Sequence, residues 1–392
     1  MMLPRRRTTV CREGWYYLAV ILALFGLALA REMNLLLLLA ALVCGPLFLS
    51  WPLVRVTLGG LAVRRRMPRE VCAGDTLVVN LELTNARRAM ASWALAVEDQ
   101  IVRDGGGEEP IRPVVYFPHV RAGERADRVY RGRLVQRGRY RFGPLRISTR
   151  FPLGFLRCTV TAGTVDTLIV FPRLGRLKPG WPLRRSEAFE GTQRRRRRHS
   201  RVPGDFYGVR EWQQGDSRRW IHWRSSARHG SLVVRHFEQH HNRDVALLVD
   251  LWQPGNAGPE DLENTELAVS FAATVMAEVC RRGGAELLIA LPTSPPQCIA
   301  GPASMPLMEE IMGRLALVQA SSRESLTELL EVALPRIHRG ADVFLVSTRS
   351  VDLADPDRFA GFWTDPARRA RLARIQVINT ASPELSEYFQ SE

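Results

Sequence analysis

At 392 residues the chain is longer than one compact core usually supports, so an anchor followed by two folded domains is expected. The net charge of +15 comes almost wholly from arginine, because Lys178 is the only lysine, and such a bias is weak evidence for nucleic-acid binding. None of the six cysteines forms a CxxC pair, which argues against a disulfide framework and a cysteine zinc site and favours a reducing compartment.

The first predicted elements are two apolar helices, over residues 14–30 and 35–54, joined by a short turn. Each is long enough to cross a bilayer, which takes roughly 17 to 25 residues. The turn carries only Arg31 against Glu32, whereas arginines flank the outer ends: Arg5, Arg6, Arg7, Arg12, Arg55, Arg64, Arg65, Arg66 and Arg69. The positive-inside rule therefore predicts a two-pass protein of the bacterial inner (cytoplasmic) membrane with both termini in the cytoplasm.

A secretory signal peptide is an alternative interpretation of the same region. Basic residues lead into the first apolar stretch, and Ala28-Leu29-Ala30 resembles a small-residue cleavage site. Even then the second helix would anchor the chain, and everything after Val54 would face the cytoplasm. Residues 1–58 are therefore interpreted as a transmembrane helical hairpin.

Residues 59–172 alternate apolar and polar side chains with period two, as in 77–83 and 93–97, and glycine or proline interrupts the pattern at regular intervals. Short strands with regular breakers are typical of an immunoglobulin-like β-sandwich. In the segments 136–145 and 151–155, Gly138 and Gly154 stand where tight turns need glycine.

Residues 173–203 are rich in proline, glycine and charge and are interpreted as a basic linker. The run from Arg194 to Arg198 fits a solvated loop that lies against anionic lipid headgroups or an acidic partner. A nucleic-acid patch would call for interleaved aromatic residues, and the run contains none.

Residues 242–392 alternate strands with helices, which predicts a Rossmann-like α/β domain with a parallel sheet wrapped by helices. The expected strands are 245–250, 285–291, 343–347 and 375–378, and the expected helices are 262–282, 305–317 and 325–337. In such folds ligands bind at the carboxyl ends of strands, which directs attention to Asp250 and Ser347.

Residues 204–241 hold an unusual concentration of side chains, with three tryptophans and five arginines between Asp205 and Arg228. Gly215-Asp216 is predicted to cap a helix over 217–228 that Gly230 ends, with Trp220, Trp223 and Ala227 on one face. Two interpretations follow: an aromatic and ion-paired clamp between domains, or a docking surface for a partner.

This segment resembles the signature of the domain of unknown function 58 (DUF58) family. The matching residues are Asp205, Phe206, Arg210, Trp212, Gly215, Asp216, Arg219, Ile221, Trp223, Ala227 and Arg228, and Val209 stands where the family has leucine. Upstream, Arg-Gly-Arg-Tyr and Pro-Leu-Gly-Phe resemble the same family's sandwich. Its members commonly begin with two membrane helices, so the resemblance covers essentially the whole chain.

The resemblance implies a C-terminal domain similar to the von Willebrand factor A fold and a partnership with MoxR-type AAA+ ATPases. It also implies transglutaminase-like membrane proteins as neighbours, in cell-envelope or protein-complex assembly. The metal-binding version of that fold has Asp-x-Ser-x-Ser after the first strand, whereas this chain has Asp250-Leu251-Trp252-Gln253-Pro254. We therefore expect no metal and no cofactor, although Asp250 could contact an arginine or lysine of a partner.

Two competing classes remain as alternatives to a membrane-anchored interaction or scaffold protein. A metal-dependent hydrolase would use the histidines between His222 and His241, namely His222, His229, His236, His240 and His241. However, residues 232–237 read as a strand, so His236 and His240 would not converge as they do on a helix. A nucleic-acid-binding protein would account for the isoelectric point near 10.6. Nucleophile and phosphate-loop motifs are missing from the sequence, so we expect no enzyme activity and no nucleic-acid partner.

Overall fold

The computed structural model describes residues 6–106, 109–162, 165–178, 181, 205–213, 218, 221–238, 244–338 and 340–391. Contacts divide the chain into two units, the first comprising Met1–Arg173 with Met312–Val318 and the second comprising Leu174–Ile311 with Gln319–Glu392. Each unit has a hydrophobic core of its own.

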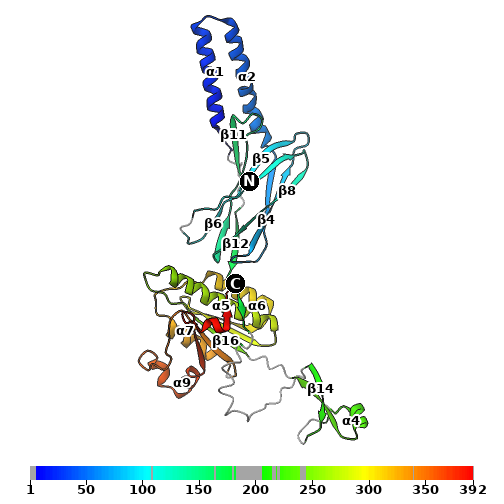
Figure 1. Cartoon of the computed structure of the whole chain (residues 1–392), viewed down its shortest axis with the longest axis vertical. Coiled ribbons are helices and arrows are strands. Elements are labelled where there is room, and N and C mark those ends of the chain that lie inside the picture. Colours follow the sequence, from blue (N-terminus) through cyan, green and yellow to red (C-terminus); the bar gives the residue numbers. More distant parts are fainter. Residues whose placement is uncertain are drawn as a thin grey trace. The chain divides into compact units, whose positions relative to one another are not determined.

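Two antiparallel helices form a hairpin in the first unit, α1 (Arg12–Ala30) and α2 (Asn34–Thr57) (Figure 1). They span 19 and 24 residues, and both are long and apolar enough to cross a membrane. Their outer surfaces expose large apolar side chains such as Leu22, Leu38 and Phe48. A surface of this kind is unfavourable in water and suits a lipid environment.

A strand that the sequence analysis missed, β1 (Arg6–Val10), comes before the hairpin. It pairs antiparallel with β11 (Leu156–Ala162), with Arg6 opposite Val160 and Val10 opposite Leu156. The arginines at its start were interpreted only as a flank of the first helix, and residues 1–58 only as a hairpin. Both interpretations need correction, because the β-sheet domain begins before the hairpin and continues after it.

Three sheets make up the β-domain, and their inward residues share one core. The five-stranded sheet has the order β1-β11-β10-β5-β7, with β10 (Leu145–Thr149), β5 (Ser92–Glu98) and β7 (Val114–Val120). The three-stranded sheet is β2 (Leu61–Arg66), β4 (Thr76–Asn85) and β8 (Arg125–Arg133). The four-stranded sheet is β3 (Val71–Cys72), β12 (Asp166–Phe171), β9 (Gly138–Phe142) and β6 (Ile101–Arg103). Strands such as β9 bury every second residue, which is the expected alternation of a sheet with one face on a core.

A charged cluster lies buried inside this domain. The guanidinium of Arg65 donates two hydrogen bonds to the carboxylate of Asp99, at 2.8 and 2.6 Å, and one to Asp166 at 2.7 Å. The hydroxyl of Tyr130 donates to Asp99 at 2.7 Å, and burial together with the charge of Asp99 raises the pKa of Tyr130. Neither the Arg65 nor the Asp99 side chain is exposed to solvent, so the ion pair between them lies in the core.

The hairpin is joined to the β-domain at both of its roots. At the start of α1, the backbone N–H of Cys11 donates to the carbonyl of Phe155 at 2.8 Å, and the ring of Tyr17 stacks on Phe155 at 4.2 Å between centroids. At the end of α2, the guanidinium of Arg87 donates to the carbonyls of Val56 and Thr57 at 2.7 and 3.1 Å. Arg87 therefore adds charge-assisted hydrogen bonds to carbonyls in the last turn of the helix.

We expect Gly14→Ala to loosen this junction, because the added methyl group would overlap the carbonyl oxygen of Phe155. Overpacking of this kind costs about 1–3 kcal/mol, so the melting temperature of the full chain in detergent should fall. Gly26→Ala on the same helix is the matched control, since no atom lies within 4 Å of its added methyl group. Equal melting temperatures for the two variants would contradict the assigned packing.

The second unit contains a five-stranded sheet with the order β18-β17-β16-β19-β20. Its strands are β16 (Val245–Asp250), β17 (Glu286–Leu291), β18 (Gln297–Pro302), β19 (Asp342–Ser347) and β20 (Ile375–Asn379). The helices are α5 (Pro259–Arg282), α6 (Met305–Leu317), α7 (Leu326–Ala333), η3 (Leu334–Arg336), α8 (Ala360–Trp363), α9 (Pro366–Leu372) and α10 (Leu385–Tyr388).

Alternate residues of the central strands face different helices. Leu248 in β16 and Leu345 in β19 pack in one core with α7, α8 and α9. On the other side, Phe344 of β19 contacts Trp181, whose ring also lies edge-on to Phe271 of α5 at 5.7 Å. Strand β16 is buried at every position, as expected for a strand covered on both faces.

Two features of this unit differ from the sequence predictions. Strand β18 runs antiparallel to β17, so the sheet is mixed rather than parallel. The expected linker over 173–203 begins with β13 (Arg176–Leu177), which pairs with β21 (Phe389–Gln390) near the end of the chain. Most of the remaining linker, including the run Arg194 to Arg198, lies outside the described residues.

Candidate interaction site

The signature segment forms a two-stranded ribbon, β14 (Asp205–Glu211) and β15 (Val233–Glu238). Its ladder runs from Asp205 opposite Glu238 to Glu211 opposite Val233, with a bulge after Phe206. The backbone N–H of Trp212 extends the pairing by donating to the carbonyl of Leu232 at 2.8 Å. The ribbon thus brings the first part of the signature next to the segment that follows its helix.

A short helix, α4 (Trp223–His229), stands between the two strands. The prediction of a helix from residue 217 was wrong about its start, because Ile221 bridges to Val234 and His222 donates its N–H to Val233 at 2.8 Å. This ladder keeps the backbone extended through His222, whose Nδ1 then caps the helix by accepting from the N–H of Ser225 at 3.1 Å. Gly230 ends the helix in the left-handed region at φ 69°, as expected.

One face of α4 lies against the ribbon and the opposite face is open. The hydroxyl of the buried Ser226 accepts a hydrogen bond from the N–H of Val233 at 2.9 Å. Trp223 is 68% exposed, and Arg224, Ala227 and Arg228 are exposed with it. Exposed tryptophan and arginine side chains on one helix are residue types that protein interfaces favour at their energetic centre.

The remaining signature residues are described only in part. Asp205, Phe206 and Arg210 lie in β14, where the structure describes their backbone, and Ile221 and Trp212 are half-buried. Gly215, Asp216 and Arg219, with Trp220, lie outside the described residues. Trp223 and Ala227 do lie four residues apart on α4, on its open face.

The histidines considered as metal ligands occupy different structural positions. His222 caps α4, His229 ends that helix, and His236 lies in β15. His240 and His241 are outside the described residues. Within the part of the chain that the structure describes, no three His, Cys, Asp or Glu side chains gather as metal ligands.

A second candidate site lies where β16 and β19 end side by side, with Asp250 opposite Ser347. The carboxylate of Asp250 accepts from the Ser347 hydroxyl at 3.0 Å and from Nε of Arg349 at 3.3 Å. The guanidinium of Arg349 also donates two hydrogen bonds to Glu324, at 2.8 and 2.7 Å, and lies 5.0 Å from the ring of Trp252. Asp250 was expected to contact an arginine or lysine of a partner. In the structure, Arg349 of the same chain makes this contact.

The electrostatics of the two carboxylates differ. Burial raises the pKa of Asp250, and the charge of Arg349 opposes that rise without cancelling it. The hydrogen bond from Arg349 lowers the pKa of Glu324, against the effect of its partial burial. Strand ends in the sequence indicated Asp250 and Ser347 but not Arg349, although the position of Arg349 two residues after a buried strand was a usable signal.

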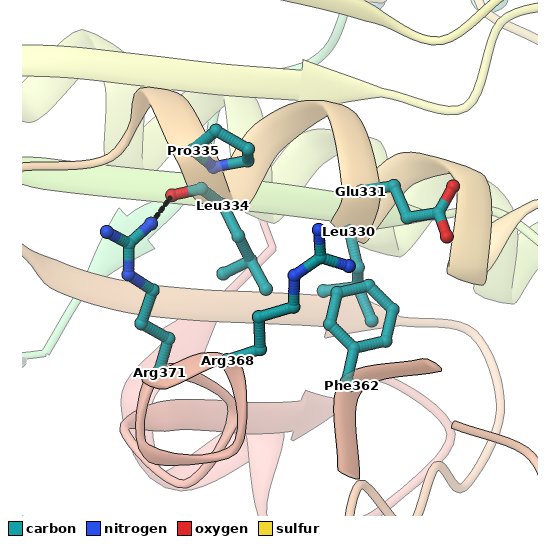
Figure 2. Close-up of a pocket in the computed structure, with 7 residues that line it drawn as sticks. All are labelled: Leu330, Glu331, Leu334, Pro335, Phe362, Arg368 and Arg371. Atoms are coloured by element: carbon teal, nitrogen blue, oxygen red, sulfur yellow. Dashed lines mark hydrogen bonds between the residues drawn. The ribbon is translucent and has the colours of Figure 1, made fainter. Parts of the chain in front are cut away.

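A small pocket on the same unit is lined by both apolar and arginine side chains (Figure 2). It lies between α7 with η3 on one side and α8 with α9 on the other, and its lining is Leu330, Glu331, Leu334, Pro335, Phe362, Arg368 and Arg371. Arg371 donates to the carbonyl of Leu334 at 2.8 Å, and Arg368 lies over the ring of Phe362 at 5.9 Å. These contacts tie α9 to η3 and α8.

Most of the ribbon, α4 and the α/β sheet lie in the region that matches a family model. Residues 208–384 match the family model described as protein of unknown function DUF58. The uncharacterized protein YeaD of Bacillus subtilis (strain 168) is 28% identical over 150 residues, which cover 38% of this chain and 35% of that protein.

Among solved structures, two similarities cover parts of this chain with very low scores. The CARDB domain of the PF1109 protein from Pyrococcus furiosus has 13% identity over 28% of this chain and 91% of that one, with a TM-score of 0.19. The superoxide reductase (neelaredoxin) from Ignicoccus hospitalis has 14% identity over 28% of this chain and 80% of that one, with a TM-score of 0.19. Scores of this size support no conclusion about fold or function. The match over 208–384, slightly less than half of the chain, contains the described signature residues from Arg210 to Arg228 and confirms that this region resembles the DUF58 family.

Proposed function

We propose that this protein is a membrane-anchored, cytoplasmic-facing interaction or scaffold protein that works with a MoxR-type AAA+ ATPase in cell-envelope or protein-complex assembly. The observation that carries the proposal is the open face of α4, where Trp223 projects among Arg224 and Arg228. Exposing an indole is unfavourable for an isolated protein and becomes favourable when a partner covers it.

The arrangement of β1 supports the proposed orientation. Since β1 before α1 and the strands after α2 belong to one β-domain, both outer ends of the hairpin lie on the same side of any membrane that it crosses. Arginines at those ends favour the cytoplasmic side. Cleavage after Ala30, as in the signal-peptide alternative, would remove β1 from the sheet, and this weighs against that alternative.

The order of the second sheet supports a von Willebrand factor A-like domain. Strands β16 to β20 follow the order 3-2-1-4-5, with the third antiparallel, so the order reverses between β16 and β19. Ligand sites of such sheets lie at this reversal, beyond the carboxyl ends of the strands. Here a guanidinium, that of Arg349, already neutralises Asp250 at that place, so we assign partner binding to α4.

The decisive experiment measures the affinity of the full chain, in detergent, for a MoxR-type ATPase. We expect Trp223→Ala to raise the Kd by about 30-fold or more, since central interface tryptophans contribute about 2 kcal/mol or more. Trp93→Ala is the control, because Trp93 is an exposed tryptophan of the first unit. An unchanged Kd for Trp223→Ala would remove α4 from the interface.

A further inference from the structure

Two loops of the β-domain flank the roots of the hairpin. The loop Phe151–Phe155 reaches along α1 as far as Tyr17, which is about 8 Å from the helix start at 1.5 Å per residue. The loop Ala86–Ala91 lies at the end of α2, where Arg87 binds two of its last carbonyls. In Figure 1 the hairpin accordingly rises from the end of the domain where β11 and β5 lie.

Large apolar side chains are exposed on and beside these loops. Leu153 is 50% exposed, Met90 44% and Trp93 46%. The ring of Trp93 stacks on Phe151 at 6.3 Å and lies 4.2 Å from the ring of His119, so its position is fixed by neighbours. Leu153, Met90 and Trp93 gather at the end of the domain that carries the hairpin.

Aromatic and basic side chains continue this surface onto the helices. Trp15 and Trp51 are exposed near the outer ends of α1 and α2, and tryptophan prefers the boundary between lipid headgroups and acyl chains. Exposed arginines lie on the helix ends and on the two loops, and the guanidinium of Arg55 lies 5.1 Å from the Trp51 ring. The others are Arg12, Arg88 and Arg150. Apolar residues among arginines complement an anionic lipid surface.

We propose that the β-domain itself contacts the bilayer through a membrane seat made of Met90, Trp93 and Leu153, with the boundary of an anionic lipid membrane as its occupant. The proposal rests on the proposed function, because the hairpin must span that membrane. The membrane seat lies next to the outer ends of α1 and α2, so the depth of the hairpin in the bilayer also determines the depth of the seat. Because both roots are bonded to the loops that surround it, the seat holds the β-domain at a fixed height on the membrane.

The test uses the full chain in vesicles of phosphatidylcholine and phosphatidylglycerol whose acyl chains carry bromine close to the headgroup. Bromine quenches nearby indoles, and the difference between wild type and Trp93→Phe isolates the emission of Trp93. We expect the brominated lipid to remove most of that emission. Trp252→Phe is the control for a tryptophan of the second unit, whose emission should persist.

A second comparison of emission, between wild type and Trp15→Phe, distinguishes a wrong assignment of the membrane seat from a hairpin that does not insert into the membrane. Trp15→Phe isolates a tryptophan of α1 itself. Quenching of Trp15 without quenching of Trp93 overturns the seat and leaves the anchor intact, whereas loss of quenching at both overturns the anchor as well. In vesicles of phosphatidylcholine alone the quenching of Trp93 should weaken, and equal quenching would overturn the part assigned to the arginines.

Discussion

Replacing Asp99 with alanine should lower the free energy of unfolding of the β-domain by about 3–5 kcal/mol, the usual cost of breaking a buried ion pair. The variant leaves the guanidinium of Arg65 with Asp166, whose side chain is 45% exposed, and with the carbonyl of Phe142. Tyr130 also loses the acceptor of its hydroxyl. A charge that was neutralised in the core is then only partly compensated.

Thiol labelling measures this effect in the intact protein, because each unit holds one buried cysteine. Cys158 lies in β11 of the first unit and Cys280 in α5 of the second. When opening is faster than labelling, the labelling rate follows the population of the open state. Asp99→Ala should therefore speed labelling of Cys158 by about two to three orders of magnitude, at 1.4 kcal/mol per tenfold, and leave Cys280 unchanged.

Glu98→Ala removes the same charge from the neighbouring position and is the matched control. Glu98 pairs with Arg146 at 3.8 Å near the surface, and such pairs contribute about 1 kcal/mol or less. If both variants label Cys158 at similar rates, the buried cluster is not what stabilises the domain.

The second large effect is expected for Arg349→Met, which removes the cation from between Asp250 and Glu324. Among the described residues, Asp250 then keeps the hydroxyl of Ser347 as a side-chain donor, and the expected loss is again about 3–5 kcal/mol. Labelling of Cys280 should accelerate while labelling of Cys158 stays as in the wild type. Arg323→Met, which breaks an exposed pair with Glu328, is the control and should cost about 1 kcal/mol or less.

This loss should depend on pH. Without Arg349 the pKa of Asp250, already raised by burial, rises further, so the folded chain binds the proton more readily than the unfolded chain. The cost is therefore smallest at low pH and grows as the pH rises through the folded-state pKa. Urea unfolding of the full chain at about pH 5 and about pH 8 measures the difference.

Glu324 contributes in the same direction. In the wild type its lowered pKa stabilises the fold above the unfolded-state pKa, and that contribution fades as the pH falls. The double variant Asp250→Asn with Arg349→Met removes the uncompensated carboxylate and should recover part of the loss at high pH. A pH-independent cost in the single variant would show that Asp250 is not the responsible group.

The sequence predicted the helices and strands whose order of apolar and polar residues follows directly from which side chains are buried. Strand β16 lies over residues 245–250 as expected, because a fully buried strand reads as a continuous apolar run. The helix expected over 262–282 starts slightly earlier, at Pro259, where the side chain of Asp261 accepts from the N–H of Gly258. Local chemistry of this kind is visible in a single sequence.

Elements that depend on a distant partner were missed. Strand β1 reads as a basic leader because Arg6, Arg7, Thr8 and Thr9 are polar, and it becomes a strand only when paired with β11. Strand β18 contains Gly301 and Pro302, which usually break strands, and it lies at the sheet edge, where they are tolerated. The late start of α4 likewise follows from its pairing with Val233.

The candidate sites show the same division. Asp250 and Ser347 could be selected because they are polar residues at the ends of strands. The guanidinium that binds Asp250 belongs to Arg349, which lies in a loop, and the sequence does not specify the path of that loop. In the signature segment, the sequence indicated the residues but left open whether they form a clamp between domains or a docking surface for a partner. The structure shows that Trp223 is exposed on α4, which is the feature on which the proposed partner surface rests.

The position of β1 also constrains how the protein is made. Thr8 in β1 contacts Cys158 in β11, 150 positions later in the chain. A ribosome must therefore deliver both hydrophobic helices and nearly the whole β-domain before this sheet gains its outer strand. If the hairpin were inserted in the opposite orientation, β1 and β11 would still lie in the same compartment. If only one of the two helices crossed the membrane, β1 and β11 would lie on opposite sides of it and could not pair. If the hairpin spans a membrane, the pairing of β1 with β11 therefore requires that both helices cross it.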